Sequence, residues 1–444
     1  MLKKISQGTA VITLLAAAGI ANAGVSGDEA AKLKTTLTPL GAERSGNAAG
    51  TIPPWDGGLT KVAKPGEPVV DQFSDKPILT LNAANFEQYR ANLAEGTMAM
   101  FKKHPDFRMQ IHKTQRTAAA PQWVYDNTFR NATAAKSTQE GLSISGAYGG
   151  IPFPIPKTGT EAMWNHLLAY QGEATRIHFR AWMVEASGKR ILASEGITER
   201  QFPYYDPESN LEKSGGVAGM SRNLQVAPPF KAGEQILVKE PLDQVGVGRQ
   251  SWQYLVGQRR VRRAPSIGYD TPNLVTSGTT IFDEVAMFNG AMDRYEWTLV
   301  GKKEIFIPYN RNRLFLAKDT DVLTPKFVNP DLSRWELHRV WIVEASLGAG
   351  KRHVYAKRRF YLDEDTWGVM LAEAYDAQGQ LWRYSENVPF AAGNPGQGWA
   401  GELQFNMLDD SYVSTITMVE PFRTVAKRPA TYFSPEALAG SSAR

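Results

Sequence analysis

The sequence lacks several features on which whole classes of protein depend. It contains no cysteine among 444 residues, which excludes disulfide bonds, thiolate zinc sites, iron–sulfur ligation and cysteine nucleophiles. It has no run of about 18 apolar residues, so we expect no membrane-spanning helix. It also lacks a P-loop, a G-x-S-x-G elbow and histidines at the spacing of a helical zinc site. The sequence therefore predicts no catalytic residues, no metal site and no cofactor.

The first 23 residues have the three regions of an export signal. A short cationic stretch precedes an apolar stretch at 11–20, which is too short to cross a bilayer, and a small-x-small cleavage site ends at Ala23. We predict cleavage between Ala23 and Gly24. Because residue 24 is not cysteine, we expect a periplasmic chain without a lipid anchor. The small net charge of +5 argues against nucleic acid as a partner.

After residue 23 the sequence divides into three regions with different predicted structure. Residues 24–145 combine a stretch rich in Gly, Pro and Thr with a helical segment at 82–103, and we expect them to form an N-terminal arm over the main body. Residues 146–430 are predicted to form an antiparallel β domain, and residues 431–444 a C-terminal tail. Near the start of this domain, Thr158 and Glu161 form a capping box that predicts a helix to about residue 170.

The β domain is predicted from alternation of apolar and polar residues. Ile177, Phe179 and Ala181 alternate with charged residues, which is typical of a half-buried strand. Short turns such as 376–379 separate such segments, and short turns join antiparallel neighbours. The predicted fold is therefore α+β and mainly antiparallel: a large curved sheet, or half-open barrel, with few covering helices and an extended N-terminal arm.

Aromatic residues concentrate in the predicted strands. They can pack beneath a covering helix or line an apolar cavity, and for any single residue core packing is the commoner use. A concave apolar sheet face must nevertheless be covered by something. The candidates for lining a ligand cavity are Trp252, Tyr254, Trp297, Trp335, Trp341, Tyr355, Trp367 and Trp382.

Four arginines occur within five positions of the segment 252–263, which we interpret as one strand. Guanidinium groups bind carboxylates and phosphates through paired hydrogen bonds. Salt bridges to neighbouring strands are the alternative use of such residues. The candidates for holding the head group of an anionic lipid or fatty acid are Arg259, Arg260, Arg262 and Arg263.

Several motifs resemble an exported proteobacterial family of unknown function (DUF1329), often labelled outer-membrane lipoprotein-sorting protein. They are G-I-P-F-P at 150–154, R-R-V-R-R-A-P at 259–265, Y-D-T-P at 269–272, W-T-L-V-G-K-K-E at 297–304 and R-R-F-Y-L-D-E-D-T-W at 358–367. The core segments are also similar to the LolA/LolB superfamily of periplasmic lipid carriers. This resemblance implies a half-open barrel that holds acyl chains or another hydrophobe. It also implies an outer-membrane-associated partner and an RND-type exporter.

The sequence thus favours a soluble periplasmic binding or carrier protein for a hydrophobic ligand, such as a lipid or fatty acid, that works with envelope transport machinery. Two alternatives stay open. One is a periplasmic hydrolase acting on a lipid or carbohydrate through carboxylates such as Asp283 or Asp363. The other is a carbohydrate-binding module, in which exposed tryptophan rings stack on sugars.

Overall fold

The computed structural model describes residues 24–60, 69–264, 267–393 and 396–440. The predicted export signal, including Ala23, lies outside these residues. Cleavage before Gly24 therefore stays a prediction.

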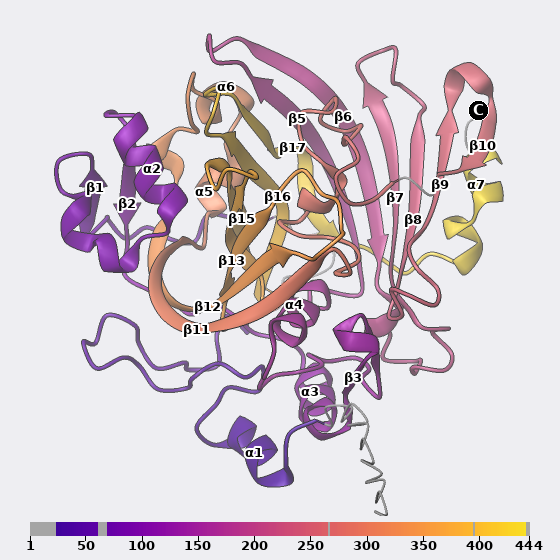
Figure 1. The fold of residues 1–444 in the computed structure, drawn as a ribbon, viewed down its shortest axis with the longest axis horizontal. Helices are drawn as coiled ribbons and strands as arrows, with labels where there is room; N and C mark the ends of the chain where they lie inside the picture. Colours follow the sequence, from indigo (N-terminus) through magenta and orange to yellow (C-terminus); the bar gives the residue numbers. More distant parts are fainter. Residues whose placement is uncertain (1–23, 61–68, 265–266, 394–395, 441–444) are drawn as a thin grey trace, which may run out of the picture.

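One sheet of 15 strands dominates the molecule (Figure 1). In sheet order its strands are β1 (Leu79–Asn82), β2 (Arg108–Ile111), β12 (Trp335–Leu347), β13 (Lys357–Asp363), β14 (Val369–Tyr375), β15 (Leu381–Gly393), β16 (Gly396–Asn406), β17 (Tyr412–Thr424), β5 (Ala174–Val184), β6 (Arg190–Gln201), β7 (Val217–Ala227), β8 (Gln235–Pro241), β9 (Gln250–Leu255) and β10 (Arg260–Arg263), with β11 (Tyr295–Pro308) paired to β12. These neighbours pair antiparallel, except for one parallel contact between β2 and β12. A separate hairpin joins β3 (Lys136–Thr138) and β4 (Ser143–Ser145).

The sheet is curved and not closed. Its order ends in β1 and β10, which do not pair with each other. Figure 1 shows β11–β16 wrapping one side of the molecule while β7–β10 extend on the other. The prediction of an α+β, mainly antiparallel fold with a large curved sheet is confirmed.

The predicted turn and strand patterns appear in the sheet. The turn after β14 is closed by Asp376, whose carboxylate accepts the N–H groups of Gln378 and Gln380 at 2.9 and 2.8 Å, and Gly379 has a positive φ of 77°. On β5, Ile177 and Phe179 are buried. Charged residues on the opposite face of β5 bind acidic residues of its neighbours; Arg180, for example, bonds to Glu195 of β6 at 2.8 Å.

Helices are few and short. They are α1 (Gly27–Ala31), α2 (Glu95–Lys103), α3 (Gln122–Ala134), α4 (Gly159–Leu167), α5 (Asn312–Leu316), α6 (Asp319–Val322) and α7 (Pro435–Gly440). Helix α4 begins as predicted, since the Thr158 hydroxyl accepts the Glu161 N–H at 3.2 Å. In Figure 1, α3 and α4 lie below the sheet, α2 lies beside β1 and β2, and α7 lies beside β10. No helix within the described ranges has both the length and the apolar content needed to cross a bilayer.

The helix predicted over residues 82–103 is wrong in its first half. Residues Leu79–Asn82 form β1, Phe86–Asn92 form a 3₁₀ helix, and only Glu95–Lys103 is α-helical. The Asn85 side chain accepts the Asn82 N–H at 2.9 Å, and the Asn82 side chain accepts the Ala84 N–H at 2.9 Å. Such local side-chain bonds compete with helical ones and favour a turn.

Two large apolar clusters form the core. One includes Phe101 of α2 with Trp335 and Tyr384 of the sheet. The other includes Trp164 of α4 with Trp367 at the turn between β13 and β14. Residues 24–60 lie against this body, with the Trp55 indole N–H donating to the Ala118 carbonyl at 3.0 Å.

Candidate functional site

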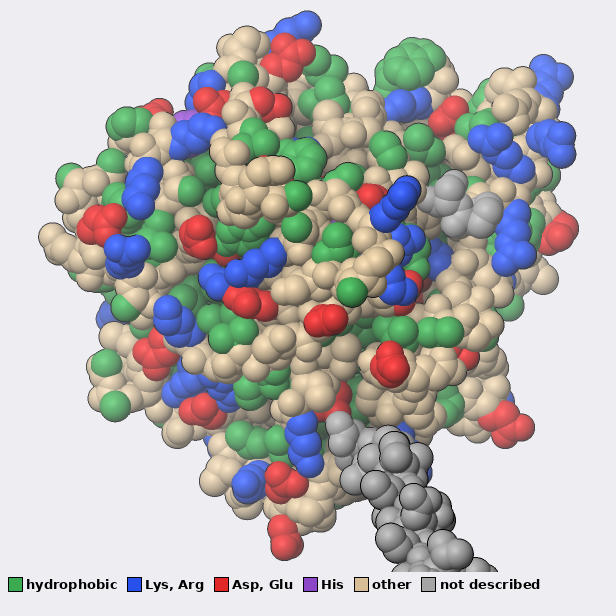
Figure 2. Space-filling view, in the orientation of Figure 1, with side chains coloured by type: hydrophobic (Ala, Val, Ile, Leu, Met, Phe, Trp, Pro, Cys, Tyr) green, Lys and Arg blue, Asp and Glu red, His purple; other side chains and the backbone are tan. Residues whose placement is uncertain are grey.

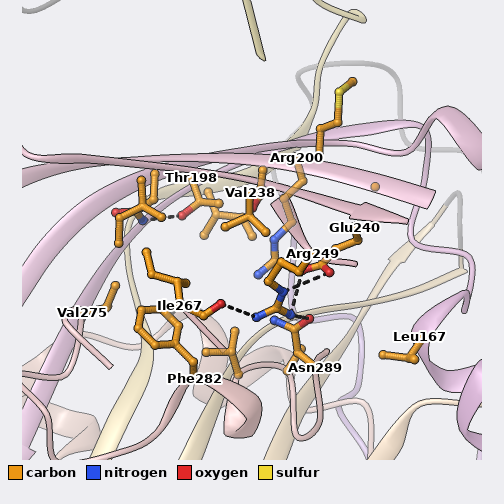
Figure 3. Close-up of a pocket in the computed structure, with 18 of the residues that line it drawn as sticks. Leu167, Thr198, Arg200, Val238, Glu240, Arg249, Ile267, Val275, Phe282 and Asn289 are labelled. Carbon is orange, nitrogen blue, oxygen red and sulfur yellow. Dashed lines mark hydrogen bonds and ion pairs between the residues drawn. The ribbon is translucent and has the colours of Figure 1, made fainter. Parts of the chain in front are cut away.

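A cavity of about 260 Å³ lies against the inner face of the sheet (Figure 3). Strands β5–β8 line one side of it, with contributions from β16 and β17. The other side is formed by the end of α4 and by the segment 267–292, which connects β10 to β11. We call this segment the covering segment. Apolar atoms supply most of the lining surface.

Small and large side chains lie side by side on the inner face of the sheet next to the cavity. Gly196 and Thr198 of β6 lie beside Phe179 and Ile177 of β5, and a Cβ at Gly196 would already lie 3.2 Å from the Phe179 ring. Ala218 of β7 also lines the cavity. Larger groups at the lining positions Thr198 and Ala218 would fill part of the space, as in an ordinary core.

His166 holds the covering segment from α4. Its Nε2 atom lies 3.1 Å from the Ala286 carbonyl oxygen and 3.2 Å from that of Phe288. Its Nδ1 atom accepts the Val369 N–H at 3.2 Å, so Nε2 must carry the proton and donate it. Burial lowers the pKa of His166 to about 4, which keeps the ring neutral at physiological pH.

Asp283 holds the covering segment from the sheet side. Its carboxylate lies 2.9 Å from His353 Nε2 and 3.0 Å from the Arg358 guanidinium. Burial alone would raise the pKa of Asp283, but Arg358 and His353 keep it below its ordinary value. The next residue, Glu284, accepts the Tyr355 hydroxyl at 2.7 Å. Asp283, named above as a carboxylate for hydrolysis, thus lies in a buried ion pair and is not among the residues that line the cavity.

Four charged residues give the cavity its electrostatic character: Arg200, Glu240, Arg249 and Glu402. Arg249 binds Glu240 at 2.8 Å and the Asn289 side chain at 2.5 Å. Arg200 projects from β6 into the cavity in Figure 3 and makes no ion pair or side-chain hydrogen bond with another described residue. Burial raises the pKa of Glu402 to about 7, although Arg200 and the Ala286 N–H act in the opposite direction.

None of the eight aromatic residues proposed from the sequence is among those that line this cavity. Trp335 and Trp367 are fully buried in the two main core clusters, and the Trp367 indole donates to the Leu40 carbonyl at 2.7 Å. Trp252 and Tyr254 pack with residues of α7. The remaining four are half-buried or buried among the aromatic contacts of β11–β15: Trp297, Trp341, Tyr355 and Trp382. Contact of these rings with a ligand stays a prediction.

The single strand predicted over 252–263 is wrong, because the segment is a hairpin. β9 and β10 pair across a turn at Val256–Gln258, and Arg259 takes a left-handed conformation with φ 46°. Arg259, Arg260, Arg262 and Arg263 are all exposed and do not line the cavity. Basic side chains gather over this hairpin in Figure 2, on its upper right. Since β10 is an edge strand, these charges discourage pairing with another chain.

No motif in the sequence points to Arg200, Arg249 or Glu402 as residues of a site. Arg200 follows Gly196 and Thr198 on the alternating face of β6, so period-two analysis places it with those residues. That this face is the inner one follows only from the pairing of β6 with β5, in which Gly196 lies opposite Phe179.

A second buried polar cluster surrounds the motif at 358–367. His338, Asp363 and Asp365 have potential ligand atoms within 4.8 Å of one another. However, Arg116 already binds Asp365 through two hydrogen bonds of 2.8 and 2.6 Å. Asp363 accepts the Thr366 N–H and hydroxyl at 3.1 and 2.7 Å. We therefore interpret the cluster as a network that joins the N-terminal arm to the sheet.

The cavity offers little for catalysis. His166 is the one histidine of the described lining, and both its ring nitrogens engage backbone groups. The Thr415 hydroxyl bonds to the backbone of Glu402. No hydroxyl of the described lining is thus activated by a histidine.

Comparison with known proteins places the chain in a family. Residues 80–439 match the model described as "Protein of unknown function (DUF1329)". An uncharacterized protein of Pseudomonas aeruginosa, PA3922, is 42% identical over 393 residues, covering 86% of each chain. Similar solved structures include a DUF1329 family protein from Desulfovibrio piger (15% identity, TM-score 0.40, covering 60% of this chain and 91% of that one). Another is a LolA superfamily protein from Nitrosomonas europaea (11% identity, TM-score 0.38, covering 64% and 100%). The chain belongs to the DUF1329 family.

Proposed function

We propose that this protein is a periplasmic binding or carrier protein for a hydrophobic ligand. The observation that supports the proposal is the cavity of about 260 Å³ whose lining is mostly apolar. Small-molecule sites are usually concave, mostly apolar spaces of about 300–1,000 Å³ with a few placed polar groups. The cavity has this apolar character and a volume just below that range.

The predicted export signal supports a periplasmic location. The resemblance of the sequence to the LolA/LolB carriers supports transfer of the ligand to an outer-membrane-associated partner and cooperation with an RND-type exporter. The outer-membrane-associated partner and the RND-type exporter are parts of this proposal.

The two alternatives have less support from the described residues. Hydrolysis would need a nucleophile and base in the cavity, and the lining lacks a bonded pair of that kind. Sugar binding would need exposed tryptophan rings, and no tryptophan among the residues with a described side chain is exposed.

A cavity-filling substitution tests the proposal. Val238 lies on the cavity-facing side of β8, so Val238→Trp should fill the space and abolish uptake of a fluorescent fatty acid. Val300 of β11 is 55% exposed, so Val300→Trp makes the same change on the surface and should bind as the wild type does.

Native mass spectrometry of protein purified from the periplasm supplies a second readout. We expect a non-covalently bound hydrophobe in the wild type and in Val300→Trp, and none in Val238→Trp. Absence of both a bound hydrophobe and probe uptake in the wild type would refute the carrier proposal.

A further inference from the structure

The polar groups of the cavity lie together on one side of it. Arg200 of β6 pairs with Ser221 of β7, which pairs in turn with Val238 of β8. The next residue of β8 on the same face is Glu240, the partner of Arg249. Figure 3 shows Arg200, Glu240, Arg249 and Asn289 on one side of the space, with Val275, Ile267 and Phe282 on the other. The cavity is therefore amphipathic.

The two arginines of the cavity differ in their partners. Arg249 is neutralised by Glu240 and further bound by Asn289 and the Ile267 carbonyl. Arg200 has no such partner among the described residues. An arginine stays charged in a protein. Arg200 is half-buried, and a charge partly withdrawn from water without a bonded counterion is unfavourable. Arg200 thus offers an unused set of donors for an anion.

Glu402 compensates Arg200 only in part. The two residues influence each other electrostatically but form no ion pair in the described structure. Because the pKa of Glu402 is raised to about 7, a large fraction of its carboxyl groups is uncharged near neutral pH. The positive charge of Arg200 remains available under those conditions.

The size of the cavity restricts the apolar part of the ligand. A volume of about 260 Å³ lies below the usual range for small-molecule sites. It suits one flexible chain and is too small for a lipid with two or three acyl chains. Ile177, Phe179 and Ile236 lie along the sheet face that such a chain would contact.

We infer that the cavity binds a single-chain anionic amphiphile of the fatty-acid class, with its carboxylate on the guanidinium of Arg200 and its chain against Ile177, Phe179 and Ile236. The inference rests on the proposed carrier function and adds the identity of the head group. Guanidinium matches a carboxylate through two parallel hydrogen bonds, which are stronger than bonds between neutral groups.

The test compares laurate with lauryl alcohol, which has the same chain and no charge. Each compound displaces the neutral fluorescent probe phenylnaphthylamine from the wild type, from Arg200→Gln and from Arg260→Gln, an exposed arginine of β10 that serves as control. The wild type and Arg260→Gln should bind laurate at least about tenfold more tightly than lauryl alcohol, as expected for a charge-assisted bond. Arg200→Gln should lose this preference.

Binding of lauryl alcohol shows that Arg200→Gln is folded with its cavity intact, because that compound needs no charge. Equal binding of the two compounds by the wild type, or an unchanged preference in Arg200→Gln, would overturn the head-group assignment and leave the carrier function standing. If neither compound nor the probe binds the wild type, the carrier function itself fails.

Discussion

Glu402 and Arg200 reach the cavity from strands that are not neighbours, β16 and β6. The Glu402 carboxyl accepts the N–H of Ala286, and the nearby Glu284 disfavours its charged form. Among the other titratable groups of the cavity, His166 is neutral above its pKa of about 4, and Glu240 is paired with Arg249. Glu402 is therefore the cavity group that changes charge near neutral pH.

We predict that binding of an anion weakens as the pH rises through about 7. Below this pH the Glu402 carboxyl is protonated and Arg200 is free to bind the anion; above it, the carboxylate competes for the same guanidinium. Titration with an alkanesulfonate, which stays ionised throughout, separates this effect from protonation of the ligand. Glu402→Gln should bind with high affinity at every pH, and a pH dependence that persists in this variant would contradict the assignment.

The sequence shows the chemical type of each residue, but it does not show which residues are neighbours in the fold. The arginines at 259–263 stand out in the sequence because they are clustered, but the cluster forms an exposed hairpin at the edge of the sheet. Arg200 is isolated in the sequence, and its importance comes from its position on the lining of the cavity, beside Thr198 and opposite the covering segment. Free volume depends on strand pairing, which single residues do not encode.

At the scale of the elements, the covering segment forms one side of the cavity. It contains only a short 3₁₀ helix at Phe282–Glu284, so its position depends on the bonds that tie it to the body. His166 bonds to it from α4, and Arg358 and His353 bind its Asp283.

Asp283→Asn should loosen this segment. The substitution leaves the Arg358 guanidinium, which is 2% exposed, without its carboxylate, and an uncompensated buried charge is strongly destabilising. Hydrogen–deuterium exchange of peptides from 267–292 should accelerate, and bound probe should dissociate faster. Asp270→Asn is the control, since Asp270 lies in the same segment and forms no ion pair with a described residue. Equal exchange in the two variants would mean that the ion pair does not hold the segment.

Local patterns were sufficient to predict several elements. The capping box at Thr158 and the turn at Asp376 each depend on side chains that bond to backbone a few residues away, so no tertiary information is needed. Local bonds also explain why the first half of the helix predicted over 82–103 is wrong, because the side chains of Asn82 and Asn85 form a turn there.

For the whole molecule, the alternation of apolar and polar residues and the short turns were sufficient to predict the fold class. They were not sufficient to predict the order of the strands in the sheet. Consecutive pairing accounts for the runs β12–β17 and β5–β10. The step that creates the concave face is the pairing of β17 with β5, which joins segments more than 200 residues apart in the chain. Such long-range pairing is set by packing of the complete sheet.

The network around Asp365 connects parts of the chain that are distant in sequence. Arg116, which is 5% exposed, binds Asp365 and donates to the Glu43 carbonyl at 2.8 Å. Lys302 of β11 bonds to Glu43 and to Glu364 at 3.0 and 2.8 Å. The N-terminal arm and the sheet are therefore expected to unfold together.

We predict that Asp365→Asn lowers the free energy of unfolding by about 3–5 kcal/mol, because it removes the carboxylate that forms two hydrogen bonds with the buried Arg116 and leaves only that of Glu364, 3.7 Å away. Asp363→Asn is the matched control. Burial and the neighbouring Asp365 raise the pKa of Asp363, so the fold already favours an uncharged group there, and an amide oxygen can accept the same bonds from Thr366. Urea denaturation at neutral pH should show a loss below about 1.5 kcal/mol for this control. A similar loss in both variants would show that Arg116 finds other partners and that Asp365 does not hold the arm in place.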